Sequence, residues 1–129
     1  MIRSFADLDG PIVFAHAHPD DETLATGALI RHVRRHGIPA YVLTATRGER
    51  GDVVPGPLGH LAGTPELVPW RERELAGALA ALDVTGHAYL GTAPARRHGE
   101  PPRTYRDSGM RWVRSEERRV GKECRALCR

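Results

Sequence analysis

The sequence predicts an α/β fold built on a parallel sheet. Three short apolar runs, at residues 11–16, 40–45 and 87–90, have the length and composition of buried strands. Segments with helical spacing of their apolar residues lie between them. A strand, helix and strand in this order form a right-handed crossover with parallel strands, so the chain begins with a βαβ unit.

The first half of the chain supplies that unit. Residues 11–16 follow Asp9-Gly10, and their β-branched and aromatic side chains favour a buried strand over a helix. The apolar residues that come next and share helical spacing are Leu24, Ala25, Ala28, Leu29 and Val33. They predict one helix over residues 22–35. Gly37 and the proline that follows at position 39 end this helix, and residues 40–45 form the second strand.

The second half contains a long loop, a helix and a third strand. Residues 46–69 are rich in Gly and Pro, and loops of this length in compact domains are usually functional or mobile. The next helical stripe consists of Leu75, Ala78, Leu79 and Leu82. It predicts a helix over residues 70–83, before the strand at 87–90. Residues 91–113 show no periodicity, so we expect a loop over the strand ends.

The composition limits the class of protein. Hydrophobic residues make up 40% and charged residues 27% of the 129, which is typical of one soluble globular domain. No apolar run approaches the roughly eighteen residues of a membrane span, so we expect no membrane association. The first residues carry an early acid and lack an apolar stretch of signal-peptide length, which predicts a cytoplasmic protein.

The positive charge lies in the C-terminal tail. Residues 114–129 hold six of the 19 Lys and Arg residues and three of the 16 acids, so residues 1–113 are neutral and the tail carries the net +3. The tail also holds the single lysine, Lys122, and both cysteines, Cys124 and Cys128. Its sequence resembles the translation of a common sequencing adapter, so we expect it to be non-native. The alternative is a solvated basic helix end or a basic nucleic-acid arm, and the neutral charge of residues 1–113 argues against a nucleic-acid partner.

The residues with the clearest chemical potential follow the first strand. His18, Asp20 and Asp21 lie where this strand ends and a helix begins, the edge where ligands bind in open parallel sheets. His18 and Asp21 are three residues apart and can converge on one cation, and an imidazole with a carboxylate suits Zn²⁺. Asp20 between them is able to take a proton from a water that the ion activates. The alternative is an ordinary helix N-cap followed by first-turn acids.

Four sequence strings together resemble one enzyme family. Residues 17–22, Ala-His-Pro-Asp-Asp-Glu, match the signature of the PIG-L/LmbE-like zinc N-deacetylases. Residues 46–51 resemble the threonine-x-glycine-glutamate loop of the family, and residues 71–75 resemble its arginine-led helix start. Residues 105–110, Tyr-Arg-Asp-Ser-Gly-Met, resemble a loop of the mycothiol-pathway members. These members deacetylate N-acetylglucosaminyl-inositol or cleave mycothiol conjugates.

The resemblance implies a fold and a role for each site residue. The fold is a Rossmann-like three-layer α/β sandwich, of which the chain holds the N-terminal part. His18 and Asp21 correspond to zinc ligands and Asp20 to the general base. Arg71 corresponds to a residue that contacts the substrate, an N-acetylated aminosugar, and Asp107 to one that hydrogen-bonds a sugar hydroxyl. Structural alternatives remain for the last two, since Arg71 can pair with a glutamate three residues later on its helix and Asp107 can form a turn.

The remaining histidines have no ligand spacing. His16 points away from His18 if the strand alternates, so we expect a packed side chain. The others, which we expect on the surface or in the core, are His32, His36, His60, His87 and His98.

One expected feature of the family is missing. Its members take a third zinc ligand, a histidine, from a later string that this sequence lacks, and the resemblance stops near Val113. A catalytic zinc site uses three protein ligands, so we expect the chain as it stands to be inactive. The function that the resemblance implies is removal of the N-acetyl group from N-acetylglucosaminyl-inositol, and we expect this activity of the complete gene product. The alternatives are a mycothiol S-conjugate amidase and a non-catalytic sugar-binding module.

Overall fold

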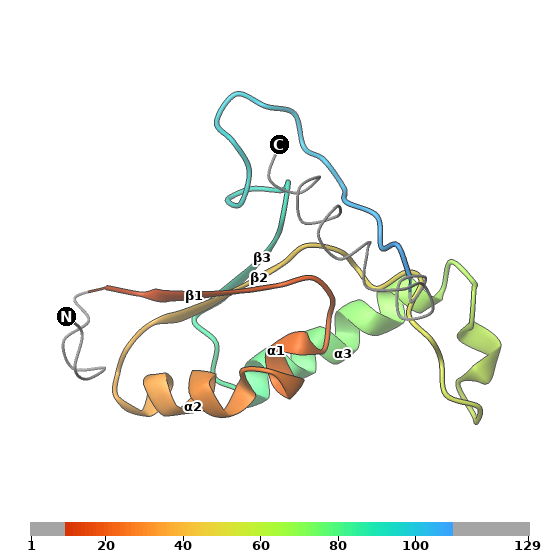
Figure 1. The fold of residues 1–129 in the computed structure, drawn as a ribbon, viewed down its shortest axis with the longest axis horizontal. Helices are drawn as coiled ribbons and strands as arrows, with labels where there is room; N and C mark the ends of the chain where they lie inside the picture. The colour runs from red at the N-terminus through yellow and green to blue at the C-terminus, as the bar shows by residue number, and fades with distance from the viewer. Residues whose placement is uncertain (1–9, 110–129) are drawn as a thin grey trace, which may run out of the picture.

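The computed structural model describes residues 10–109, which form a three-stranded parallel sheet with helices packed against one face (Figure 1). The strands β1 (Ile12–His16), β2 (Ala40–Thr44) and β3 (Gly86–Tyr89) lie side by side in chain order. Ile12 pairs with Ala40, so the first two strands have matched ends. The predicted α/β class and parallel sheet are confirmed. Residues 10–109 supply the sheet and one helical layer of the predicted sandwich.

The core lies between the sheet and this helical layer. Strand residues alternate between the two faces: Phe14 and Val42 are buried against the helices, whereas Val13 and Tyr41 are 60% and 40% exposed on the other face. The buried core cluster consists of Phe14, Ile30, Val33, Ile38, Ala40 and Val42. Burial of each large side chain of this kind contributes about 1.5–3 kcal/mol. Strands β1 and β2 are thus buried on one face, whereas all four residues of β3 are half-buried.

The prediction of a single helix over residues 22–35 is wrong, because the structure has two helices there. α1 (Asp21–Leu24) is one turn long and α2 (Gly27–Arg35) begins after a break. At the break, the Thr26 hydroxyl donates to the Glu22 carbonyl at 3.1 Å and lies 3.0 Å from His16 Nε2. This hydroxyl thereby occupies the carbonyl that a continuous helix would offer to the Thr26 N–H.

The break also changes which face of the helix is buried. Ile30 and Val33 are fully buried, with Gly27 one turn before them. Leu24 and Leu29, which we expected in the apolar stripe, are 81% and 41% exposed. The predicted stripe is confirmed at Val33 and wrong at Leu24 and Leu29, because it assumed one uninterrupted helix through the break.

The second crossover agrees more closely with expectation. α3 (Leu67–Ala81) starts three residues earlier than predicted, with Pro69 in its first turn, where a missing N–H costs no helical hydrogen bond. In α3, Leu75 is buried and Leu79 packs on the core as predicted, and so does Leu82 directly after the helix. The preceding loop holds one short 3₁₀ helix, η2 (Gly59–Leu61).

The segment after β3 is a loop through residue 109, as predicted. Gly91 is essential to its path: its φ is +85°, and a Cβ there would lie 2.5 Å from the Arg103 carbonyl oxygen. The expectations for the tail at 114–129, including both cysteines, and for Met110 and Val113 lie outside the described residues. Between residues 10 and 109, no helix is long and apolar enough to cross a membrane.

Candidate active site

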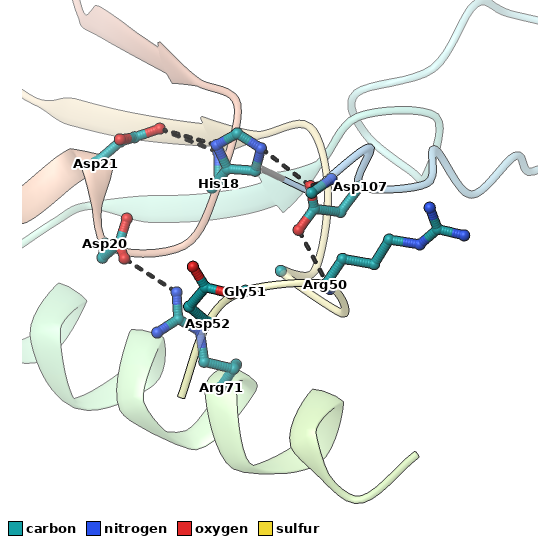
Figure 2. Close-up of a pocket in the computed structure, with 10 residues that line it drawn as sticks. His18, Asp20, Asp21, Arg50, Gly51, Asp52, Arg71 and Asp107 are labelled. Carbon is teal, nitrogen blue, oxygen red and sulfur yellow. Dashed lines mark hydrogen bonds and ion pairs between the residues drawn. The ribbon is translucent and has the colours of Figure 1, made fainter. Parts of the chain in front are cut away.

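A cavity of about 360 Å³ lies at the carboxyl end of β1 (Figure 2). Three segments that are far apart in the sequence form it: the turn after β1, the glycine-rich loop after β2 and the loop that contains Asp107. α3 closes the remaining side through Arg71. The lining residues are His18, Asp20, Asp21, Gly48, Arg50, Gly51, Asp52, Arg71, Asp107 and Gly109. All five site residues predicted from the sequence therefore meet in one cavity of the size that binds small ligands.

His18 and Asp21 face one another across the turn. The distance from His18 Nδ1 to Asp21 Oδ2 is 3.6 Å, and the same Asp21 oxygen accepts the His18 backbone N–H at 3.2 Å. Both side chains are about one-third exposed, at 33% and 37%, so a cation can reach them. Their donor chemistry fits Zn²⁺, although residues 10–109 contain no group of three His, Cys, Asp or Glu side chains able to hold a metal.

Asp107 approaches His18 from the opposite side of the ring. Its Oδ1 lies 3.3 Å from His18 Nε2, and its side chain is only 3% exposed. The same carboxylate accepts the backbone N–H of Gly109 at 2.8 Å and of Arg50 at 3.3 Å. An imidazole that donates Nε2–H to Asp107 keeps the lone pair of Nδ1 on the side that faces Asp21. The turn expected at Asp107 is present, and the carboxylate also contacts the predicted ligand.

Asp20 lies in the N-cap position of α1 but does not cap it. Its φ is +113°, and its side chain makes no capping hydrogen bond. The alternative of an N-cap followed by first-turn acids is therefore correct for the positions of Asp20, Asp21 and Glu22 but not for the contacts of the Asp20 side chain. The Asp20 carboxylate instead accepts a hydrogen bond from Arg71 Nη2 at 3.0 Å, and the same nitrogen donates to the Pro19 carbonyl at 2.8 Å. Arg71 Nη1 lies 3.9 Å from Glu74, so the expected helix pair is present as a longer contact.

The loop after β2 requires a glycine at position 48, where it lies close to Pro19. The φ of Gly48 is +67°, and a Cβ at this position would lie 3.2 Å from the ring of Pro19. Thr46 fixes the start of the same loop, because its hydroxyl donates to the Ala17 carbonyl at 3.0 Å. The loop after β2 is thus held against the turn that carries His18.

No other histidine of the described residues lines the cavity. His16 is packed beside Thr26, as predicted, rather than directed at His18. His87 lies 3.0 Å from the Thr44 hydroxyl, and burial lowers its pKa from the ordinary value of 6.5. His36 and His60 each bond to a backbone carbonyl on the surface.

Sequence reasoning missed two residues near the predicted base. Glu22, expected only as a first-turn acid, is 1% exposed and hydrogen-bonded to the Asp20 backbone. Its place at the end of the charged string was the available signal. Asp52 lines the cavity from the glycine-rich loop, and only the length of that loop pointed to it.

The chain belongs to the PIG-L family, described as GlcNAc-PI de-N-acetylase, whose model matches residues 13–126. This match extends beyond residue 113. The boundary between residues 1–113 and the tail at 114–129 stays a prediction. A 1D-myo-inositol 2-acetamido-2-deoxy-alpha-D-glucopyranoside deacetylase of Kineococcus radiotolerans is 44% identical over 87% of this chain and 29% of its own length. The protein of the same name from Streptomyces scabiei is 41% identical over 83% of this chain and 31% of its own.

The chain spans about a third of the length of the curated relatives it matches. Among solved structures, the N,N'-diacetylchitobiose deacetylase of Pyrococcus horikoshii superposes with a TM-score of 0.56 at 22% identity. The match covers 93% of this chain and 36% of that one. This likeness supports the fold described above.

Proposed function

We propose that this chain carries the N-terminal half of the active site of a zinc-dependent hydrolase that removes the N-acetyl group from an N-acetylglucosaminyl-inositol sugar. The observation that carries the proposal is the meeting of His18, Asp20, Asp21, Arg71 and Asp107 in one cavity. The substrate class follows from the names of the relatives that are 41–44% identical. The complete protein would hold the remaining parts of the site.

Each residue has a role that its contacts support. His18 and Asp21 would hold Zn²⁺, which when bound lowers the pKa of a water and polarises an amide carbonyl. Asp20 is half-exposed to the cavity and accepts the proton that the attacking water loses. Arg71 keeps the Asp20 carboxylate in place and, where its guanidinium lines the cavity, would contact the substrate.

Asp107 would serve both the metal ligand and the sugar. One carboxylate oxygen contacts His18 and the N–H of Gly109, and the other accepts only the longer bond from Arg50 within the described residues. A carboxylate oxygen has two lone pairs, so this second oxygen is able to accept a sugar hydroxyl as well.

We further propose that the 129-residue chain alone is inactive. The described residues offer two donors, His18 and Asp21, where a catalytic zinc site uses three protein ligands. A weakly held ion would leave the reaction without its activated water. The complete site then requires the segment that the relatives have and this chain lacks.

A chimaeric protein tests the function. Residues 1–109 are joined to the part of the Kineococcus deacetylase that follows its matched region, and amine release from N-acetylglucosaminyl-inositol is measured with zinc content. We expect bound zinc and amine release, both abolished or strongly reduced in the metal-ligand variant His18→Ala. Asp20→Asn should retain zinc but lose amine release by at least about 100-fold. A folded chimaera without metal and without amine release, beside an active Kineococcus control, would overturn the proposal.

One substrate comparison separates the related functions. Faster release of amine from a mycothiol S-conjugate than from N-acetylglucosaminyl-inositol would assign the chain to the amidase activity instead. Binding of the sugar without metal, and without any amine release, would assign it to a non-catalytic sugar-binding module.

A further inference from the structure

Glu22 is a buried carboxylate next to the cavity that the proposed reaction does not use. It is 1% exposed and does not line the cavity that holds His18, although it lines a second cavity on which Asp20 and Arg71 also border. Both of its oxygens have donors: Oε2 accepts the Asp20 backbone N–H at 2.9 Å, and Oε1 accepts the Thr23 hydroxyl at 2.7 Å. Burial of a carboxylate costs free energy unless hydrogen bonds compensate for the lost water. The two short hydrogen bonds of Glu22 supply this compensation and hold its neighbours in defined positions.

We propose that Glu22 is a positioning residue that holds the Asp20 backbone so that the Asp20 carboxylate faces the cavity. This inference rests on the proposed function only in taking Asp20 as the base. The geometry at Asp20 can be tested separately from any metal or activity.

The backbone of Asp20 has an unfavourable conformation that needs support. Its φ of +113° lies in a region that residues with a Cβ rarely adopt, and such strain persists only where the surroundings over-determine it. Here the Asp20 carbonyl accepts the N–H groups of Thr23 and Leu24 at 2.9 and 3.0 Å. Glu22 holds the other side of the same residue through its N–H. The backbone of Asp20 is therefore fixed at both its donor and its acceptor.

This arrangement frees the side chain of Asp20. An aspartate at an N-cap ordinarily turns its carboxylate back onto the first N–H groups of the helix. In a capping box, a glutamate three residues after the N-cap residue accepts a hydrogen bond from its backbone N–H. Glu22 makes the same contact with the Asp20 N–H, although it lies two residues after Asp20. Asp20 makes no capping hydrogen bond, and its carboxylate points to Arg71 and the cavity (Figure 2).

Two substitutions distinguish hydrogen bonding from charge. Glu22→Gln keeps an acceptor for the Asp20 N–H and removes the negative charge, whereas Glu22→Ala removes both. The matched control is Glu100→Ala, which removes a carboxylate that is 43% exposed and lies 3.1 Å from Arg103 in the loop after β3. If Glu22 positions Asp20 through the hydrogen bond, Glu22→Gln should keep the Asp20 N–H as protected from exchange as it is in the original chain.

Amide hydrogen exchange of the ¹⁵N-labelled 129-residue chain measures the positioning directly. We expect the Asp20 N–H to exchange about tenfold faster in Glu22→Ala, the loss of one buried hydrogen bond, and within about threefold of the original in Glu22→Gln. The Ile30 N–H, which bonds to the Thr26 carbonyl in α2, should be unchanged in both variants. In the chimaera, Zn²⁺ affinity should fall about 10- to 100-fold in Glu22→Ala and stay within about threefold in Glu22→Gln and Glu100→Ala.

The outcomes separate the two proposals. Unchanged protection of the Asp20 N–H in Glu22→Ala would overturn the positioning role, and so would equal losses in Glu22→Ala and Glu22→Gln, which would indicate charge. If Glu22→Ala unfolds, so that Ile30 loses its protection too, Glu22→Gln decides: retained protection of Asp20 supports the role and lost protection overturns it. A folded chimaera that binds no Zn²⁺ counts against the proposed function, while the exchange of the Asp20 N–H in the 129-residue chain still decides the role of Glu22.

Discussion

Replacement of Asp107 by alanine should destabilise the chain because this carboxylate joins three segments of the site. Asp107 is 4% exposed, and its oxygens accept N–H groups of Gly109 at 2.8 Å and Arg50 at 3.3 Å and contact His18 Nε2 at 3.3 Å. A buried donor left without its acceptor costs about 1–3 kcal/mol. The bond to Gly109 is short and the other two are long, so we expect about 2–3 kcal/mol in total for Asp107→Ala.

Asparagine provides a graded version of the same change. Asp107→Asn keeps one oxygen, which can still accept the Gly109 N–H, and places an amide nitrogen where the Arg50 N–H finds an acceptor now. We expect Asp107→Asn to lower the free energy of unfolding by about 1–2 kcal/mol, which is less than the loss expected for the alanine variant.

Urea unfolding followed by circular dichroism measures both variants. The matched control is Asp52→Ala, which removes an exposed aspartate from the same cavity and should change the free energy of unfolding by less than about 0.5 kcal/mol. If Asp107→Ala cost no more than Asp52→Ala, the inference that Asp107 holds the loops and His18 together would be refuted.

Four further predictions follow from the same contacts. Arg71→Met should lower amine release by the chimaera about 10-fold or more while zinc content is unchanged, because the Asp20 carboxylate loses its 3.0 Å partner. Ile30→Ala should lower the free energy of unfolding by about 2–5 kcal/mol in urea, since Ile30 is fully buried. Burial lowers the pKa of His87, so the unfolded chain binds more protons and stability should fall as pH drops below 6.5. Thermal melts from pH 8 to 5 should show this fall, and His87→Gln should lessen it. Asp20→Gly should be more stable than Asp20→Ala by about 1 kcal/mol in urea, because only glycine adopts the φ of +113° without strain.

The strands could be predicted within one residue because their signal is local. Residues 11–16 and 40–45 are short apolar runs between turn residues, and the structure places β1 and β2 inside them. The break at Thr26 gives no such local signal. It depends on a hydroxyl that contacts His16, ten residues earlier and on another element, so spacing alone predicts a continuous helix.

The site was predictable where its residues are close in sequence. The three-residue spacing of His18 and Asp21 was enough to expect them on one cation, and their side chains do converge. The contact between His18 and Asp107 joins residues far apart in the chain, through a loop without periodicity. The burial of Glu22 depends on tertiary packing in the same way, so composition suggested only a first-turn acid.

The conformation of Asp20 follows from what its two neighbours must do. In a regular helical turn, successive side chains point about 100° apart, so His18, Asp20 and Asp21 cannot all face one cavity. Asp20 precedes the helix and has a φ of +113°, which interrupts the regular turn at the residue that has to point with the two proposed ligands. Strain at this position is therefore a requirement of the site, and a glycine that relieved it would also remove the carboxylate. If Asp20 is the base, as we propose, stability and catalysis oppose one another at this residue, and the hydrogen bond from its N–H to Glu22 offsets part of the strain.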